Sequence, residues 1–314
     1  MREVTATDYH TAGEPFRIVT SGVPEIPGAT VAERRSRAPQ EAAVDEVRRL
    51  LCHEPRGHAD MYGCFLVPPD DDGADLGVLF WHKDGYSTAC GHGTIALGAW
   101  AVESGRVAAA PEAVVTIDVP SGRVAAIVRC RDGAVESVTF RNVPAYVLAR
   151  SVPCGTVTVD LAYGGAVYAC VPAAAFGLTV SPAHYTELIA AGRAVKRGLA
   201  GTDVYGVILY EDLGDLPGGP HQRNVTVFAD GEVDRSPCGS GTSARVALLA
   251  ADGRLDGARE LRHDSLVGTT FMARVAARIG DSVVSEVDGA AYRTGEHRFT
   301  LDPRDPLGTG FVLR

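Results

Sequence analysis

The sequence predicts an α+β protein made of two similar domains, each with a layer of strands wrapped around a central helix. Three observations lead to this prediction: the chain has 314 residues, strand-like stretches outnumber helical ones, and a segment of the first half recurs in the second. This length is enough for two domains of ordinary size, each with its own core. We expect a pseudo-twofold axis between the domains and an active site in the cleft between them.

Strand-like segments dominate the chain. They are rich in Val, Ile, Thr and aromatic residues, and turn sequences such as PSGR and RDGA separate them. The predicted strands cover residues 77–82, 113–120, 123–130, 137–148, 155–173, 204–212 and 224–230.

Helical patterns are fewer. We expect helices over residues 38–54 and 181–200, and one directly after each of Cys90 and Cys238. Strands and helices do not alternate regularly, so a doubly wound sheet is not expected. No G-x-G-x-x-G motif opens a helix after the first strand, which argues against a dinucleotide-binding fold.

An internal repeat is the most informative feature of the sequence. Shifting the chain by 148 residues places CGHGTIA on CGSGTSA without a gap, and in both copies a strand leads to a cysteine, a glycine-rich corner, a helix and a Gly-Arg exit. The repeat predicts a first domain over residues 1–150 and a second over 151–314, and it leaves open a return of the C-terminal residues to the first. The matched pairs are Phe80 and Phe228, Cys90 and Cys238, Gly91 and Gly239, Gly93 and Gly241, Thr94 and Thr242, Ala96 and Ala244, Gly105 and Gly253, and Arg106 and Arg254.

Composition and charge exclude several classes of function. The net charge of −9 and the lack of a dense Lys/Arg run argue against nucleic acid as a partner and favour a small-molecule substrate. No run of about 18 apolar residues is available to span a bilayer, so no membrane partner is expected. The N-terminal segment MREVTATDYHTAGEPFR is charged where a signal peptide is apolar, so we expect a cytoplasmic protein.

The seven cysteines are scattered and include no Cys-x-x-Cys pair, which favours reduced thiols over a disulfide framework. Cys90 and Cys238 stand apart because the repeat places each of them just before a helix. The others are interpreted as inert, small hydrophobic side chains. They are Cys52, Cys64, Cys130, Cys154 and Cys170.

A thiol at a helix N-terminus meets unpaired backbone N–H groups and the positive end of the helix dipole, which are expected to lower its pKa. Two such corners facing each other would hold a carboxylate from both sides and place its α-carbon between two sulfurs. One thiolate would remove the α-proton while the other thiol returns a proton to the opposite face. This inversion needs no cofactor, and the sequence carries no pyridoxal-phosphate or nucleotide motif.

Two polar residues near the cysteines are further candidates. His92 is interpreted either as a capping or core histidine or as a polar contact to the substrate or the thiol. The Cys-x-His spacing would also suit zinc, but the second copy has Ser240 where His92 stands, so too few ligands remain and no metal is expected. Asp234, four residues before Cys238, suits a cationic group of a substrate, or else stabilises the turn in DGEVDRS.

Four motifs, in order over nearly the whole chain, resemble the proline racemase family. CGHGTIA and DRSPCGSGTSAR are similar to the two active-site signatures of that family, and HTAGEPFR and EPRGHADMYG extend the resemblance. The family includes 4-hydroxyproline epimerases and trans-3-hydroxy-L-proline dehydratases. The resemblance implies the diaminopimelate-epimerase-like fold, a cofactor-independent two-base mechanism and a cyclic imino acid, proline or hydroxyproline, as substrate. It also makes a homodimer the family-level expectation.

The resemblance further implies roles for individual residues. Cys90 and Cys238 would be the acid–base pair, and Asp234 would contact the ring nitrogen. The residues around the substrate carboxylate would be Gly91, His92, Gly239 and Ser240. The residues that would form loops behind the site are His10, Glu14, Glu54, Arg56 and His58.

Three functions stay open at this point. A racemase or epimerase of 4-hydroxyproline or proline is favoured by Cys238, because dehydratases resembling this protein often carry Thr there. A trans-3-hydroxy-L-proline dehydratase is favoured by EPRGHADMYG and GYSTACGHGTIAL, and by Ala89, where Met is frequent. The third alternative is a non-enzymatic imino-acid binder, or a redox sensor in which the two repeated cysteines pair.

Overall fold

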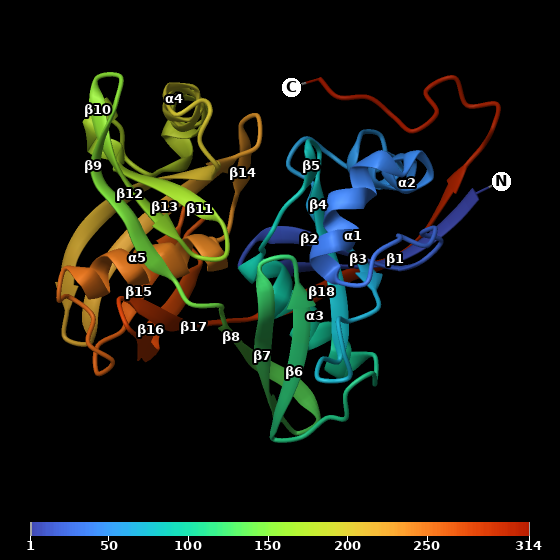
Figure 1. The fold of residues 1–314 in the computed structure, drawn as a ribbon, viewed down its shortest axis with the longest axis horizontal. Coiled ribbons are helices and arrows are strands. Elements are labelled where there is room, and N and C mark those ends of the chain that lie inside the picture. Colours follow the sequence, from blue (N-terminus) through green and yellow to red (C-terminus); the bar gives the residue numbers. More distant parts are fainter. Residues whose placement is uncertain (1, 314) are drawn as a thin grey trace.

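The protein, described by a computed structural model over residues 2–313, forms two lobes that lie side by side (Figure 1). The first lobe contains most of the first half of the chain together with the last strand. Its strands are β1 (Arg2–Thr11), β2 (Glu14–Ser21), β3 (Gly63–Val67), β4 (Leu76–His82), β5 (Gly85–Tyr86), β6 (Glu112–Val119), β7 (Gly122–Arg131), β8 (Ala134–Arg141) and β18 (Ala291–Leu301). Its helices are α1 (Val31–Arg37), α2 (Ala42–Cys52) and α3 (Gly91–Glu103), with a 3-10 turn at Ala38–Gln40.

The second lobe contains the remaining elements. Its strands are β9 (Tyr146–Cys154), β10 (Val157–Tyr163), β11 (Val167–Pro172), β12 (Val204–Leu216), β13 (Gly219–Phe228), β14 (Glu232–Asp234), β15 (Leu261–Ser265), β16 (Thr270–Ile279) and β17 (Ser282–Gly289). Its helices are α4 (Tyr185–Gly198) and α5 (Gly239–Ala251), with 3-10 turns at Ala173–Phe176 and Pro182–His184.

Strand pairing shows that the internal repeat extends over the whole topology. Each of the first nine strands has a counterpart nine places later: β2 and β3 are parallel, as are β11 and β12, and β4 and β6 are parallel, as are β13 and β15. The two halves meet where β8 pairs with β17 in antiparallel register. The strand order is β18-β1-β2-β3-β4-β6-β7-β8-β17-β16-β15-β13-β12-β11-β10-β9, with β5 on β4 and β14 on β13.

The two halves exchange their last strands. β9 pairs with β10 and packs on α5 in the second lobe, while β18 pairs with β1 from Leu301 to Ala291 in the first. The C-terminal residues therefore return to the first lobe. The domain boundary that we predicted at residue 150 falls inside β9, and the division of the chain at that residue stays a prediction.

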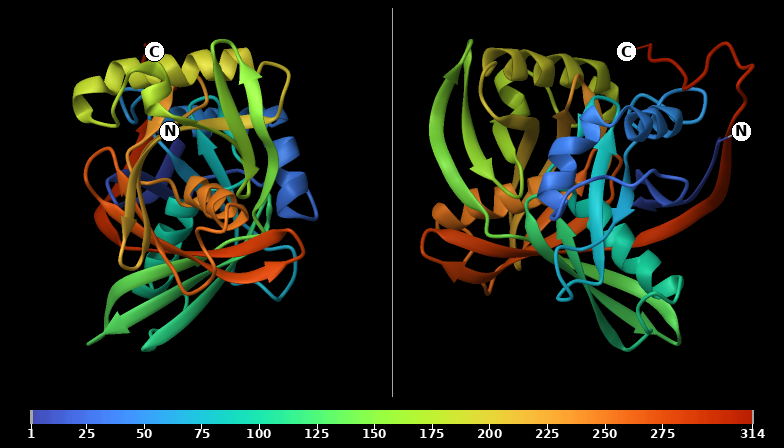
Figure 2. Two further views of the ribbon diagram at one scale, coloured as in Figure 1. Left: turned by 90° about the vertical axis from the view of Figure 1, so that its left-hand side faces the viewer. Right: turned by 45° about the vertical axis from the view of Figure 1, so that its right-hand side comes forward.

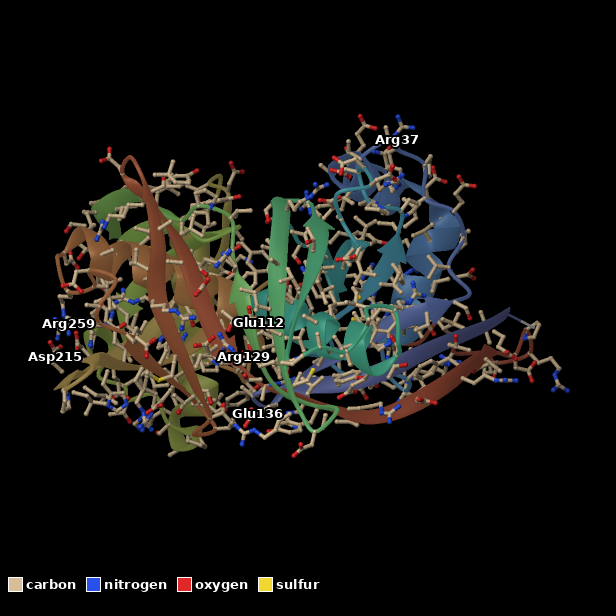
Figure 3. The ribbon with its side chains drawn as sticks, turned by 90° about the horizontal axis from the view of Figure 1, so that it is seen from below. Arg37, Glu112, Arg129, Glu136, Asp215 and Arg259 are labelled. Atoms are coloured by element: carbon tan, nitrogen blue, oxygen red, sulfur yellow. The ribbon has the colours of Figure 1, made fainter. Side chains whose placement is uncertain are left out.

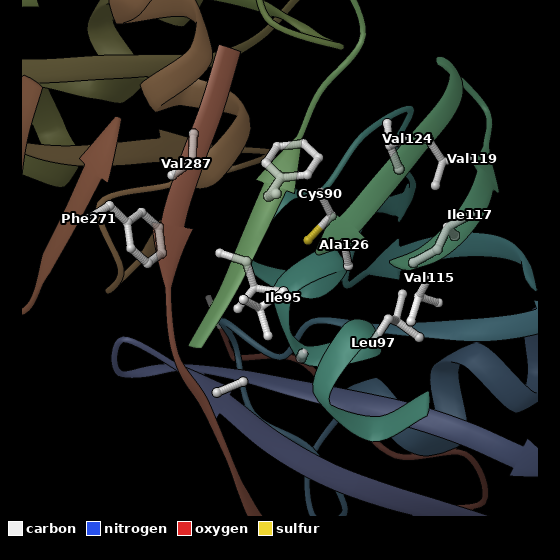
Figure 4. Packing of buried hydrophobic residues seen from close by; sticks show 14 of the residues in the cluster. Cys90, Ile95, Leu97, Val115, Ile117, Val119, Val124, Ala126, Phe271 and Val287 are labelled. Carbon is white, nitrogen blue, oxygen red and sulfur yellow. The ribbon is translucent and has the colours of Figure 1, made fainter. Parts of the chain in front are cut away.

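Each lobe wraps around one buried helix, as predicted. Residues 91–102 of α3 and 239–250 of α5 are all buried, so neither helix exposes a face to solvent. Strands of the same lobe surround each helix, and Figure 4 shows Leu97 of α3 beside Val115 of β6, with Ile95 on the side of the helix that faces Phe271. The predicted α+β fold is confirmed.

The outer elements differ in detail from the prediction. The helix expected over residues 38–54 is a 3-10 turn followed by α2, and α1 before it, capped by the Thr30 side chain, was not predicted. The strand expected over 155–173 is a hairpin of β10 and β11. Helix α4 lies across the top of the second lobe in Figure 2 and packs on β12 and β13.

Charged side chains lie on the outer surface of both lobes (Figure 3). Arg259 pairs with Asp215 at 2.5 Å in the second lobe, and Arg129 pairs with Glu112 at 3.6 Å in the first. Between residues 2 and 313, no helix has both the length and the apolar character needed to cross a membrane.

Candidate active site

The N-termini of α3 and α5 meet backbone to backbone at the junction of the lobes. A Cβ atom on Gly91 would lie 2.6 Å from the Gly239 Cα, and one on Gly239 would lie 2.7 Å from the Gly91 Cα. Neither position therefore tolerates a side chain. The repeated Cys-Gly sequence is explained by this contact, because the glycines bring the two helix ends together with a cysteine just before each.

One pocket lies at this junction. Five predicted site residues line it: Cys90, His92, Asp234, Cys238 and Ser240. The other two, Gly91 and Gly239, form the helix contact just described. The structure thus brings together all seven residues that sequence reasoning selected.

Cys90 begins α3 in an extended conformation, and its sulfur accepts a hydrogen bond from the Gly93 N–H at 3.2 Å. Both ring nitrogens of His92 lie 3.5 Å from this sulfur. Burial raises the pKa of the Cys90 thiol well above its ordinary value, the Gly93 N–H opposes this rise, and the nearby Asp234 adds to it.

Cys238 precedes α5 in a different environment. Its backbone has φ 62° and ψ 103°, a sparsely populated conformation for a residue with a side chain. Its sulfur lies 3.9 Å from the Tyr168 hydroxyl and 4.0 Å from the Ser240 hydroxyl, which bond to each other at 2.6 Å. Burial and the Asp234 charge raise the pKa of this thiol, against smaller lowering effects of the Gly241 N–H and the Thr226 and Tyr168 hydroxyls.

The expected lowering of the thiol pKa is therefore wrong, because burial raises the pKa of both thiols. The helix N-termini do supply N–H groups to both sulfurs, but removal of water from two neighbouring thiols outweighs them. A bound cation would change this balance, because positive charge next to a sulfur favours the thiolate.

Asp234 supplies a fixed negative charge in the pocket. Burial opposes its ionisation, but His92 at 3.4 Å and two hydrogen bonds from Ser236, at 2.8 and 2.7 Å, together hold its pKa below the ordinary value. An ionised carboxylate beside two helix N-termini matches a zwitterion, with the cation at Asp234 and the carboxylate at the helix ends.

The residues expected to lie behind the site have structural partners. The buried Glu14 carboxylate accepts the Arg235 backbone N–H at 2.8 Å and pairs with the Arg235 side chain at 2.7 Å. Arg56 pairs with Asp305 at 3.2 Å, and Glu54 forms an isolated β-bridge with Phe311. His58, by contrast, lines a separate small pocket near the C-terminal segment.

Sequence reasoning missed the side chains that form the rest of the pocket wall. Phe228 belonged to the repeat, but its alignment with Phe80 gave it no role. Ala89 was noted in the sequence only as a mark of a dehydratase, and the remaining wall residues were given no role. The wall consists of Tyr62, Ala89, Tyr168, Tyr205, Thr226 and Phe228.

Comparison with known proteins places this site in a family. The model of a family described as proline racemase matches residues 6–312. The chain belongs to the proline racemase family. It is therefore an enzyme, and the resemblance noted in its four motifs is confirmed.

Three proteins show which activities are represented among the relatives of this chain. A trans-3-hydroxy-L-proline dehydratase of Burkholderia cenocepacia is 44% identical, and a 3-hydroxyproline 2-epimerase of Burkholderia multivorans is 43% identical. Each alignment covers 100% of this chain and 99% of the relative. The structure of a hydroxyproline epimerase from Agrobacterium vitis, with bound trans-4-hydroxy-L-proline, matches 99% of this chain and 96% of its own at a TM-score of 0.88 and 32% identity.

Proposed function

We propose that the protein inverts the α-carbon of a proline-type cyclic imino acid, with Cys90 and Cys238 as the acid–base pair and no cofactor. The observation that carries the proposal is that both cysteines line one pocket, and that each of them lies at the N-terminus of one of two helices whose N-termini meet. An ionised carboxylate, Asp234, lies in the same pocket.

The proposed reaction follows from these groups. The ring nitrogen, as a cation, binds at Asp234, and the substrate carboxylate binds at the N-termini of α3 and α5. The positive charge of the substrate favours one thiolate in a pocket that otherwise keeps both thiols protonated. That thiolate removes the α-proton, the carboxylate oxygens take up the charge, and the opposite thiol donates its proton to the other face. The roles of the two sulfurs are then exchanged.

Dehydration is the second candidate, because the dehydratase and the epimerase among the relatives are almost equally similar to this chain. Elimination of water from a 3-hydroxyproline removes the α-proton and the ring hydroxyl and leaves a cyclic imine. It needs one base at the α-carbon, so a second thiol at position 238 favours inversion.

The test is one panel in deuterated water: both enantiomers of proline and the cis and trans isomers of 3- and 4-hydroxyproline. We expect deuterium at the α-carbon together with the opposite epimer, measured by NMR and chiral chromatography. If the product is a cyclic imine, detected with aminobenzaldehyde, and no epimer forms, the reaction is dehydration and not inversion. No exchange with any member of the panel would overturn both reactions.

Variants of the two cysteines test the acid–base assignment. Cys90→Ser and Cys238→Ser should each lower the rate of inversion by about 10²- to 10⁴-fold, the usual contribution of a general acid or base. Cys130→Ser is the matched control, because Cys130 is a half-exposed residue of β7 outside the pocket. Inversion retained in either catalytic variant contradicts the two-thiol mechanism.

A further inference from the structure

Cys238 has a strained backbone, whereas Cys90, its counterpart in the repeat, does not. The φ angle of Cys238 is 62°, in the left-handed region that residues with a side chain rarely adopt, and that of Cys90 is −154°. We propose that Asn224 and Thr242 hold this conformation and are positioning residues for the Cys238 sulfur, with His263 orienting Thr242. Their role rests on the proposed function, because it concerns one of the two sulfurs of that reaction.

Hydrogen bonds hold both ends of the peptide group between Pro237 and Cys238. The Pro237 carbonyl oxygen accepts the Asn224 side-chain N–H at 3.0 Å and the Thr242 hydroxyl at 3.1 Å. The Cys238 N–H donates to the Ser236 hydroxyl at 3.0 Å. Turning this peptide group to give Cys238 a negative φ would break all three bonds. A strained residue persists only where its surroundings fix it in this way.

His263 directs the Thr242 hydroxyl toward the Pro237 carbonyl. The His263 Nδ1 lies 2.8 Å from the Thr242 hydroxyl oxygen. The threonine has one proton, which the Pro237 oxygen accepts, so Nδ1 is the donor in this second bond. Burial and the nearby Arg245 charge lower the pKa of His263 to about 3, so the ring is neutral and its single proton lies on Nδ1.

These side chains use their donors at the corner before Cys238, while their acceptors stay unpaired. Asn224 and His263 are fully buried, and neither the Asn224 Oδ1 nor the His263 Nε2 has a hydrogen-bond partner among residues 2–313. Buried polar atoms without a partner are few in native proteins, and strain or catalysis is a common reason for them. Here the bonds that are made all support one strained peptide group.

The first half of the chain has apolar residues at the equivalent places. A shift of 148 residues puts Leu76 at the place of Asn224 and Val115 at that of His263, and neither side chain can donate a hydrogen bond. The pairs β4–β6 and β13–β15 have the same register after this shift, so the equivalence also holds in the fold.

Thr94 is the counterpart of Thr242, but its hydroxyl bonds differently. It donates to the Cys90 carbonyl oxygen at 2.8 Å, one turn back in α3, and not to the residue before the cysteine. The polar support of the preceding carbonyl thus accompanies the cysteine that has a positive φ.

The variants Asn224→Leu and Thr242→Val each remove one bond to the Pro237 carbonyl, and the first installs the residue of the first half. A sulfur that is held less firmly should transfer protons more slowly, while the groups that bind the substrate cation and carboxylate stay in place. We therefore expect kcat for inversion to fall by at least about tenfold and KM to change by less than about threefold. Thr242→Ser keeps the hydroxyl and should restore most of the wild-type kcat. His263→Leu should cause a smaller loss, because the Thr242 hydroxyl remains.

Thr94→Val is the matched control. It removes the same buried hydroxyl from the equivalent place in the repeat, where the hydroxyl bonds only within its own helix. A bond one turn back adds little to a helix, so kcat should stay within about threefold of wild type.

Labelling with iodoacetamide tests the same role without turnover. A buried sulfur reacts only when it leaves its place, so loosening the corner should speed labelling of Cys238 relative to Cys90 by at least about threefold in Asn224→Leu and Thr242→Val. Peptide mass spectrometry measures both sites in the same sample.

The outcomes separate this inference from the proposed function. A wild-type kcat together with a wild-type labelling ratio in both variants overturns the inference, as do equal losses of kcat in Thr94→Val and Thr242→Val. Either result leaves inversion itself intact. If the wild type exchanges no α-proton of any member of the panel, the proposed function fails instead, and the labelling ratio decides whether Asn224 and Thr242 position Cys238. A loss of folding in Asn224→Leu is recognised from its melting curve, and the decision then rests on Thr242→Val.

Discussion

The two candidate catalytic cysteines occupy equivalent places in the repeat but have different neighbours. Cys90 lies beside the His92 ring, whereas Cys238 lies beside the hydroxyl pair of Tyr168 and Ser240. Burial nevertheless dominates at both, and it raises the pKa of each thiol. Both thiols are therefore expected to be neutral near neutral pH, and the substrate cation is expected to promote ionisation of one of them.

Alkylation kinetics test this expectation. A raised pKa keeps a thiol protonated to higher pH, so the rate of iodoacetamide labelling at Cys90 and Cys238 should still rise steeply between pH 8.5 and 10. The rate for an unperturbed cysteine in an unstructured, blocked peptide should level off in that interval, since an ordinary cysteine thiol has a pKa of about 8.5. Peptide mass spectrometry follows each site separately, and the half-exposed Cys130 checks that labelling works on the folded protein. Fast labelling of either site at pH 7 that does not change with pH would contradict a raised pKa.

The contact between α3 and α5 explains why glycine follows each repeated cysteine. A methyl group on Gly91 would meet backbone atoms of Gly239 and Ser240, and backbone cannot rotate away as a flexible side chain can. The helices would have to separate, which moves both sulfurs.

Alanine substitutions measure this constraint. Gly91→Ala and Gly239→Ala should each destabilise the protein by about 1–3 kcal/mol, the usual cost of overpacking, and should reduce inversion further than the loss of stability explains. Gly218→Ala is the control, because a Cβ there meets nothing within 4 Å and its φ is not in the left-handed range. Thermal unfolding and the proton-exchange rate are the measurements. Wild-type activity in Gly91→Ala would show that the helix ends tolerate separation.

The repeat made the central helices and the sulfur-bearing corners predictable, because CGHGTIA and CGSGTSA align without a gap. The exchange of β9 and β18 was not predictable, since pairing partners far apart in sequence leave no local signal. Tyr62 and Tyr205 were missed for the same reason. Thr226 could have been predicted from the sequence. It lies two residues before the aligned Phe228 in a predicted strand, and residues two apart in a strand project from the same face.

Three carboxylates of the first lobe bond to backbone N–H groups of the second. Asp84, Asp60 and Glu14 of the first lobe accept backbone N–H groups of Asp230, Val233 and Arg235 in the second, at 2.9, 3.1 and 2.8 Å. These bonds hold the segment that carries Asp234. Two of these three acids, Asp60 and Glu14, are buried, whereas Asp84 is exposed.

Glu232 on β14 is a further buried acid, and its carboxylate has few polar partners. It is 1% exposed, and neither carboxylate oxygen has a hydrogen-bond partner among the described residues. The groups facing it are His82 at 3.6 Å and Lys83 at 3.8 Å, with Asp84 nearby. Burial raises the pKa of Glu232, Asp84 adds to the rise, and His82 and Lys83 oppose it.

This raised pKa predicts that the free energy of unfolding depends on pH. Between the ordinary pKa of a glutamate and the higher value in the fold, the folded state binds more protons than the unfolded state, so stability falls as pH rises through that interval. Glu232→Gln removes the titrating group. The variant should melt close to wild type at pH 4.5 and above it at pH 8, by on the order of 1 kcal/mol or about 1–2 °C. Glu25→Gln, at an exposed residue, should show no such trend. A difference in melting temperature between Glu232→Gln and wild type that is the same at both pH values would mean that ionisation of Glu232 does not destabilise the closed lobes.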